Sequence, residues 1–314
     1  MSDIQKSIRG TIVYFDIFEY PLTSFEIYKY LWRPEQRFTL AQVNKELKKM
    51  VDEKILVLRE GFFCLRGSEE NKKSRNQENI KTRKKRYLIA QEKMKKARPY
   101  VKLISKIPFV KAIFICNNLG YLNAPDDSDI DLAIITSKNT IWTVRLLAVG
   151  LMMLFNKRPN ERTQKDKICL SFYITEENLD MQSLAYENDI HFIYWLNQFM
   201  PVYGKQDLID KFYKANSWIK EYLPNCIHVK TNRRWFMTQK NIIKKIFEIL
   251  LAPRFINTWL EKIQLKEMPR HLFDLAWQEN TDVVISNKIL KFHDQDARLE
   301  VRDAWLEVQN YPSL

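Results

Sequence analysis

The stretch NAPDDSDIDLAII, residues 123–135, packs acidic side chains together and then turns wholly apolar. Its four aspartates are Asp126, Asp127, Asp129 and Asp131. If the segment is a strand, alternate side chains share a face, so Asp129 and Asp131 lie on one side and Ile130 and Leu132 on the other. Two neighbouring carboxylates repel each other unless a cation neutralises them. Mg²⁺ is commonly held by one or two carboxylates together with substrate phosphates, so the pattern predicts half of a metal–phosphate site.

The flanks of this stretch favour that interpretation over an acidic turn that merely precedes a strand. Residues 110–116, VKAIFIC, have the β-branched and aromatic content of a buried strand. A polar turn follows, and residues 129–136 form the second predicted strand. Residues 139–155 read as an apolar crossover helix, and residues 166–175 as a third strand. D-x-D by itself would favour the acidic turn, whereas the complete strand–turn–strand context favours the metal site.

The segment LGYLNAPDDSDIDLAIIT, residues 119–136, resembles the signature of the nucleotidyltransferase superfamily. This superfamily includes DNA polymerase beta, the aminoglycoside nucleotidyltransferases and the minimal nucleotidyltransferases of toxin–antitoxin pairs. Its pattern is a first strand, a Gly-Ser pair, a D-x-D on the second strand and a third carboxylate on a later strand. The resemblance covers roughly residues 85–180. It implies that Asp129 and Asp131 are the catalytic and metal-binding acids, with Mg²⁺ or Mn²⁺ as cofactor and a nucleoside triphosphate as substrate.

The remaining positions of the motif depart from the family pattern in two places. Asn117 and Asn118 stand where the family has Gly-Ser, and Gly120 lies close by in the turn. The resemblance implies that these three residues and Ser128 bind the nucleotide. The family's third acid would lie near Ser171, where this sequence has none. The nearest acids, at the ends of the predicted strand, are Asp166, Glu176 and Glu177.

Residues 1–67 resemble a winged-helix domain in the order of their elements. Three amphipathic helices are expected, and Thr23 or Ser24 and then Thr39 are placed to cap the second and third. Two short apolar runs joined at Gly61 predict a hairpin. The domain carries 11 basic and 9 acidic residues, so a role in protein contact or intramolecular packing is as probable as DNA binding. The whole chain resembles predicted bacterial nucleotidyltransferase-domain proteins with this architecture.

Most of the net charge of +13 comes from residues 68–107, which hold 14 basic and 4 acidic residues. We expect a solvated loop that passes into a basic helix from about Glu78. Such a stretch is most often a solvated linker, and the alternative is a surface that binds nucleic-acid phosphates. The residues we assign to that surface are Arg83, Lys84, Lys85 and Arg86.

Residues 181–314 are expected to be mostly helical, because apolar residues recur there at spacings of three and four. The segment KFHDQDAR, residues 291–298, is interpreted as part of a helix surface. Acids two apart on a helix do not face each other, so Asp294 and Asp296 receive no metal role.

Several other classes of protein are not supported. The four cysteines are far apart with no CxxC pair, which argues against zinc and for reduced thiols. No apolar run is long enough to span a bilayer, and residues 1–10 lack the apolar core of a signal peptide. We therefore expect a cytoplasmic protein without a membrane partner.

The expected fold class is α+β. It comprises a winged helix (1–67), a basic linker and helix (68–107), a nucleotidyltransferase-type mixed sheet (108–180, with the helix from about 85) and a helical C-terminal region (181–314). The expected function is Mg²⁺-dependent transfer of a nucleoside monophosphate to an acceptor hydroxyl on a nucleic acid, a protein or a small molecule. The alternative is a non-catalytic nucleic-acid-binding regulator with a degenerate transferase fold, which could also have a protein partner. The intact D-x-D favours the first hypothesis, and the missing third acid favours the second.

Overall fold

The computed structural model describes residues 1–66, 70–160, 162–226, 234–238, 242–251, 254–278, 281–294 and 296–310. At its N-terminus three helices pack on a small antiparallel sheet of strand order β1-β3-β2. These elements are α1 (Asp3–Ile17), β1 (Leu22–Thr23), α2 (Ser24–Lys29), α3 (Leu40–Asp52), β2 (Leu56–Arg59) and β3 (Phe62–Leu65). The hydroxyls of Thr23 and Thr39 accept hydrogen bonds from the backbone N–H groups of Glu26 and Gln42, so both predicted helix caps are present.

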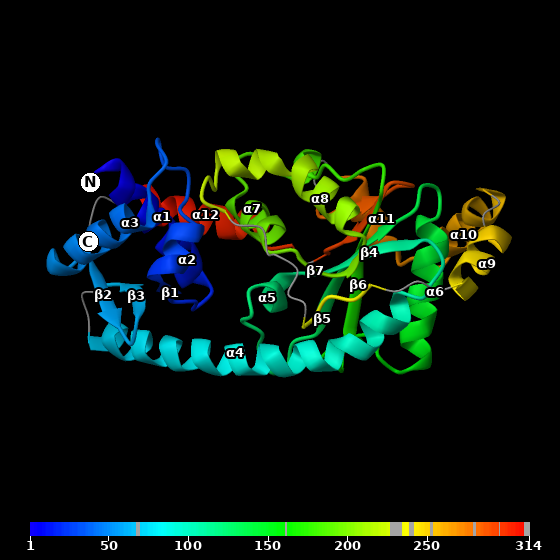
Figure 1. Ribbon diagram of the computed structural model, residues 1–314, viewed down its shortest axis with the longest axis horizontal. Coiled ribbons are helices and arrows are strands. Elements are labelled where there is room, and N and C mark those ends of the chain that lie inside the picture. Colours follow the sequence, from blue (N-terminus) through cyan, green and yellow to red (C-terminus); the bar gives the residue numbers. More distant parts are fainter. Residues whose placement is uncertain are drawn as a thin grey trace.

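A single long helix, α4 (Glu70–Ile104), connects this N-terminal unit to the main sheet. Its 35 residues give it a length of about 52 Å, and it runs along one whole edge of the molecule (Figure 1). The prediction of a loop before residue 78 was therefore wrong. The first turns are polar but contain neither Gly nor Pro, and tertiary contacts hold them: the Asn76 side chain donates to the Leu65 carbonyl at 3.2 Å, and Ile80 is buried.

The main sheet has six strands in the order β7-β4-β5-β6-β9-β8. They are β4 (Val110–Ile115), β5 (Ile130–Thr136), β6 (Ile168–Thr175), β7 (Met200–Gly204), β8 (Val283–Ile285) and β9 (Ile289–Phe292). Strand β5 is antiparallel to β4 and parallel to β6, so the sheet is mixed. The crossover between β5 and β6 is α6 (Ile141–Leu154), which agrees with the predicted apolar helix.

Helices cover both faces of this sheet. One face of β4, β5 and β6 contributes Phe114, Ile135 and Phe172 to a core shared with α7 (Ile190–Asn197), α8 (Gln206–Ala215) and the N-terminal unit. The opposite face packs against α4, α6 and α10 (Arg254–Lys266). Side-chain alternation along β5 thus sends Ile130 and Leu132 toward α4 and leaves Asp131 on the side of α7.

The C-terminal region is rich in helices, as predicted, but it also supplies three strands that were not predicted, β7, β8 and β9. Its helices are α7, α8, α9 (Ile242–Leu250), α10, α11 (Arg270–Ala276) and α12 (Arg298–Asn310), with two short 3₁₀ turns at Gln182–Leu184 and Ser217–Glu221. Strand β9 pairs with β6 over only three residue pairs, a tertiary contact that spacing within the sequence does not reveal.

After β9 the chain returns to the N-terminal unit, where α12 lies beside α1 (Figure 1). The Trp305 indole N–H donates to the Gly10 carbonyl at 2.9 Å across this contact. Within the described ranges, the helices are all too short or too polar to cross a lipid bilayer.

Candidate functional site

The two aspartates of the motif stand at the start of β5, on the rim of a cavity of about 550 Å³. Asp129 directly precedes the strand and Asp131 is its second residue, and both are half-buried and line the cavity. Ile130 and Leu132 are 0% and 1% exposed behind them. This placement agrees with the two-residue alternation predicted from the sequence, in which the carboxylates share the face that opens to a cavity.

A buried lysine from α4 holds the loop that carries these acids. The Lys93 ammonium, 1% exposed, donates to the carbonyl oxygens of Asp126 at 3.1 Å and Ser128 at 2.6 Å. It also pairs with the Asp166 carboxylate at 3.0 Å, and the Asp166 backbone N–H donates to the Ser128 carbonyl at 3.1 Å. The long helix therefore fixes the backbone immediately before Asp129.

Burial and mutual repulsion determine the ionisation of the Asp129 and Asp131 carboxyls. Burial first, and then the neighbouring Asp129 carboxylate, raise the pKa of Asp131 to about 7. Burial also raises the pKa of Asp129. Cys169 on β6 lies opposite Asp131 in the strand register, and ligand atoms of Asp129, Asp131 and Cys169 lie within 4.8 Å of one another. Without a cation, the site disfavours having both carboxylates ionised.

The donor set fits a hard divalent cation at the two carboxylates. Carboxylate oxygen is the ligand that Mg²⁺ and Mn²⁺ prefer, and the cost of ionising both acids is what a cation would remove. Cys169 does not extend that set toward Mg²⁺, because thiolates select softer metals. Strand β6 carries no carboxylate among its residues Ile168–Thr175, so this strand supplies no third acid.

The short helix α5 (Asn117–Gly120) borders the cavity beside the acids. Asn117 has a φ of 52°, a left-handed conformation that Asn tolerates better than most residues. Its side-chain oxygen accepts a hydrogen bond from the Trp195 indole, and its amide bonds to Asp131. Asn118 is exposed and lines the cavity. Asn117 thus orients Asp131, and Asn118 is free to meet a ligand.

Two residues predicted to bind the nucleotide, Gly120 and Ser128, do not line the cavity. Gly120 is buried away from the cavity, and a Cβ added there would lie 2.7 Å from the Gln198 carbonyl oxygen. The glycine is explained by this close approach of α5 to the residue that follows α7. Ser128 also does not line the cavity, and its hydroxyl donates to the Pro125 carbonyl at 3.0 Å.

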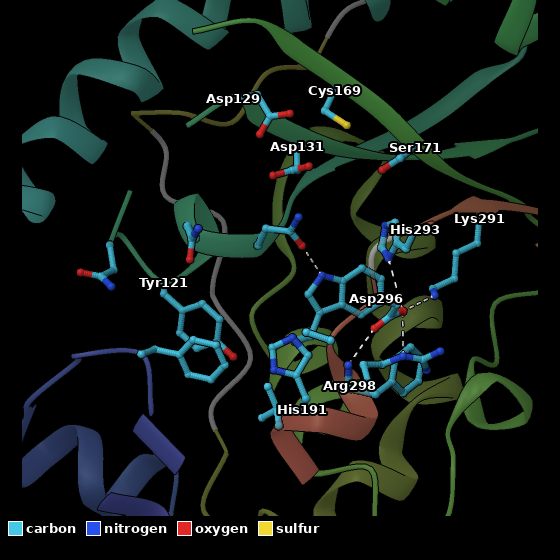
Figure 2. A pocket seen from close by; sticks show the side chains of 18 of the residues that line it. Tyr121, Asp129, Asp131, Cys169, Ser171, His191, Lys291, His293, Asp296 and Arg298 are labelled. Atoms are coloured by element: carbon cyan, nitrogen blue, oxygen red, sulfur yellow. Dashed lines mark hydrogen bonds and ion pairs between the residues drawn. The ribbon is translucent and has the colours of Figure 1, made fainter. Parts of the chain in front are cut away.

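A set of cavity residues from the C-terminal region was not predicted from the sequence. They follow or end β9 and include Lys291, His293, Asp294, Asp296 and Arg298. Figure 2 shows four of these side chains, Lys291, His293, Asp296 and Arg298, across the cavity from the two acids of the motif. The segment had been interpreted as helix, which was wrong: β9 ends at Phe292 and α12 starts at Arg298. The alternation of ILKF and the cluster H-D-Q-D-A-R were the available signals.

Arg298 organises this C-terminal cluster by using all of its donors. It is 3% exposed, and it pairs with Asp189 at 3.1 Å, with Asp282 at 2.8 Å and with Asp296 at 2.9 Å. Lys291, 1% exposed, pairs with the same Asp296 carboxylate at 2.7 Å. Two cations thus meet three carboxylates, and each of these charges has a partner of opposite sign.

Aromatic residues form the rest of the cavity wall, and many come from the N-terminal unit. They are Tyr14, Phe15, Phe18, Tyr20, Tyr121, Phe192, Trp195 and Phe292. Two histidines complete the wall: the Tyr14 hydroxyl lies 3.0 Å from His191 Nδ1, and His293 packs against Trp195. Burial lowers the pKa of His191 to about 4 and the pKa of His293 to about 3, so both rings are neutral at pH 7.

The four basic residues proposed to contact nucleic acid differ in accessibility. Arg83 is 7% exposed, donates to the Tyr20 hydroxyl at 2.6 Å and pairs with Glu26 at 3.0 Å, so it tethers α4 to the N-terminal unit. Its assignment to a phosphate-binding surface was wrong on this geometry. Lys84 pairs with Glu60 at 2.5 Å and Arg86 with Glu19 at 3.7 Å, while Lys85 is exposed.

Comparisons with known proteins gave no match to this chain, whether among protein-family models, curated proteins or solved structures.

Proposed function

We propose that this protein is an Mg²⁺-dependent nucleotidyltransferase, which moves a nucleoside monophosphate from a nucleoside triphosphate to an acceptor hydroxyl and releases pyrophosphate. The observation that carries the proposal is the pairing of Asp129 and Asp131 on one face of β5, at the rim of a large cavity. The order of β4, α5 and β5 and their resemblance to the superfamily motif support it. The β1-β3-β2 sheet with three helices supports a winged-helix assignment for the N-terminal unit.

Each residue of the site would have a distinct role in binding the metal and the triphosphate. Asp129 and Asp131 would hold Mg²⁺ or Mn²⁺, which when bound neutralises triphosphate charge and polarises the phosphorus–oxygen bonds. Asn117 orients Asp131 by its amide hydrogen bond. Asn118, exposed on the cavity wall, would donate to a phosphate oxygen. Lys93 keeps the loop before Asp129 in place through two carbonyl oxygens.

A second candidate is a nucleotide-binding regulator that does not catalyse transfer. Strand β6 favours this candidate. Its register places Cys169 opposite Asp131, and the strand carries no acid that could assist the attacking hydroxyl. The neutral His293 ring also lines the cavity and is a proton acceptor of another type. Binding and turnover must therefore be measured separately.

Binding is tested by isothermal titration calorimetry with Mg²⁺ and a non-hydrolysable triphosphate analogue. We expect wild-type protein to bind, and Asp129→Asn and Asp131→Asn each to lose at least about tenfold in affinity, equivalent to ~1.4 kcal/mol. Asp127→Asn is the matched control, because Asp127 is exposed and outside the cavity lining. Equal affinity in wild type and all three variants would show that Asp129 and Asp131 do not form the proposed metal–phosphate site.

Turnover is tested with triphosphates labelled at the α-phosphate and fractionated cell extract as the source of acceptors. Transfer of label that is lost in Asp131→Asn supports the transferase. Mg²⁺-dependent binding without any transfer of label supports the regulator.

A further inference from the structure

We propose that Cys169 is a third metal ligand beside Asp129 and Asp131, and that this set binds a cation that favours sulfur, Zn²⁺ first, in addition to Mg²⁺ and Mn²⁺. The inference rests on the proposed function in one respect, because both use the same two carboxylates. It adds a sulfur ligand from the neighbouring strand and a metal preference that the two acids by themselves do not set.

The three side chains converge from two neighbouring strands. Asp131 and Cys169 stand opposite each other in the parallel register of β5 and β6, and Asp129 directly precedes β5. One ligand atom from each of the three lies within 4.8 Å of the other two. Figure 2 shows the three side chains grouped on one side of the cavity. In the part of the chain that the structure describes, no other three His, Cys, Asp or Glu side chains come together in this way.

Hydrogen bonds hold the backbone that carries these ligands. The Ile130 N–H, between the two acids, donates to the Lys167 carbonyl at 2.8 Å. On the other side of β5, the Cys116 N–H donates to the Asp131 carbonyl at 3.2 Å. Ligands on paired strands keep their relative positions, so the site is largely formed before a cation arrives.

The spacing of the ligand atoms suits a four-coordinate ion. Zn²⁺ binds oxygen at about 2.0 Å and sulfur at about 2.3 Å, so neighbouring ligand atoms in a tetrahedral shell lie about 3.3–3.5 Å apart. The observed separations are at most 4.8 Å, and small side-chain rotations are enough to complete the shell. All three residues line the cavity, so a fourth position is open there to water or a phosphate oxygen.

The Cys169 thiol already contacts both acids. It is a hydrogen-bonding partner of the Asp129 and Asp131 carboxylates and of Ser171. When a metal binds, the S–H bond breaks, its proton passes to solvent, and a sulfur–metal bond forms. Because thiolates select Zn²⁺ over Mg²⁺, the cysteine changes which cation the site prefers.

The position of Cys169 distinguishes it from the other three cysteines. Cys169 lines the cavity, whereas Cys64, Cys116 and Cys226 do not. Cys64 and Cys116 are buried, and Cys226 is half-buried. A site built from one cysteine and two acids on neighbouring strands needs no CxxC pair, so the wide spacing of the cysteines along the chain does not reveal it.

Co²⁺ tests the proposal, because it occupies zinc sites and a thiolate ligand gives it a charge-transfer absorption band in the near ultraviolet. The metal-stripped full-length chain, kept reduced with a phosphine, is titrated with Co²⁺. We expect wild type to develop this band, and Zn²⁺ to abolish it by displacing Co²⁺. Cys169→Ser and Asp131→Asn should each lose most of the band. Cys226→Ser is the matched control and should keep it, because Cys226 is outside the cavity lining.

Affinities for two metals supply a second measurement. Competition with a chelating dye gives the Zn²⁺ affinity, and calorimetry gives the affinity for Mg²⁺ with a non-hydrolysable triphosphate. Cys169→Ser should bind Zn²⁺ at least about tenfold more weakly, and should lose less than about threefold in affinity for the Mg²⁺ complex, because Mg²⁺ favours oxygen ligands.

The outcomes separate this inference from the proposed function. Absence of the band in wild type, or a band that survives in Cys169→Ser, overturns the sulfur-containing site, while Asp131-dependent binding of the Mg²⁺ complex keeps the transferase site. A Cys169-dependent band without any binding of the Mg²⁺ complex supports the sulfur-containing site and overturns the proposed function. Failure of wild type to bind Co²⁺, Zn²⁺ and the Mg²⁺ complex overturns both.

Discussion

Two clusters of buried charge face each other across the cavity, and they differ in how their charges are balanced. In the C-terminal cluster, Arg298 and Lys291 meet three carboxylates, and hydrogen bonds occupy all their donors. In the other cluster, Asp129 and Asp131 are like charges, and burial together with the neighbouring Asp129 carboxylate raises the pKa of Asp131 to about 7. Removing one partner from a paired cluster leaves an uncompensated buried charge, whereas a pair of like charges gains most from a ligand of opposite charge.

The largest effect is expected from breaking the paired C-terminal cluster. Arg298→Met would leave the buried carboxylates of Asp189 and Asp296 and the half-buried carboxylate of Asp282 without the cation that they share. We expect a loss of about 3–5 kcal/mol in the free energy of unfolding, measured by urea denaturation. Arg302→Met is the control, because Arg302 has one carboxylate partner, the exposed Asp303, and a long hydrogen bond to the Glu187 carbonyl, and it should cost less than about 1 kcal/mol. Equal effects would mean that the cluster adds no stability.

The next effect is expected at Lys93, which connects α4 to the acidic loop. Lys93→Met removes a buried ammonium that holds two carbonyl oxygens and pairs with Asp166. We expect a loss of about 2 kcal/mol in unfolding free energy and weaker Mg²⁺-nucleotide binding. Lys95→Met, at an exposed lysine two residues away, should change neither quantity by more than about 0.5 kcal/mol. Normal nucleotide binding by Lys93→Met would show that the loop is held by other contacts.

Asp131→Asn should change stability by a similar amount but in the opposite direction. Because the folded-state pKa of Asp131 is raised, the native protein binds this proton more tightly than the unfolded chain. That contribution is fully present below about pH 4 and is lost as the pH rises through about 7. At pH 8 we therefore expect Asn to stabilise the metal-free protein by about 1–3 kcal/mol, with the gain shrinking as the pH falls to 5. Urea titrations of both proteins at several pH values measure it, and a destabilised variant at pH 8 would mark Asp131 as a structural partner.

The smallest effect on stability is expected on the outer face of α4. Lys84 and Lys85 are exposed, so replacing both by Ser should change unfolding free energy by less than about 0.5 kcal/mol. If this face contacts duplex DNA, the double variant should flatten the log–log salt dependence of binding by about 0.9 per lost contact. Arg83→Ser, in contrast, should lower stability through its lost pair with Glu26. An unchanged salt slope would leave α4 as a linker.

The elements that local sequence determines were predictable. Capping threonines, amphipathic spacing and the apolar runs of β4, β5 and β6 depend on residues close in sequence. The same holds for Asp129 and Asp131, whose shared face follows from the period of a strand.

Features that depend on tertiary contact were not predictable. Strand β9 has four residues and is paired with β6 from more than a hundred residues earlier. The spacing of Asp294 and Asp296 therefore indicated a helix surface, and their position on the cavity was missed. The burial of Arg83 against Tyr20 was hidden in the same way, because one cation in a basic run cannot be told from its neighbours by composition.

If Asp129 and Asp131 together hold a divalent cation at the cavity, a crystal soaked with Mn²⁺ and a non-hydrolysable triphosphate will contain that ion. We expect an anomalous-scattering peak about 2.1–2.2 Å from carboxylate oxygens of both residues, with phosphate oxygens completing the shell. An anomalous map without a peak at these carboxylates, although the triphosphate is visible elsewhere in the molecule, would contradict it.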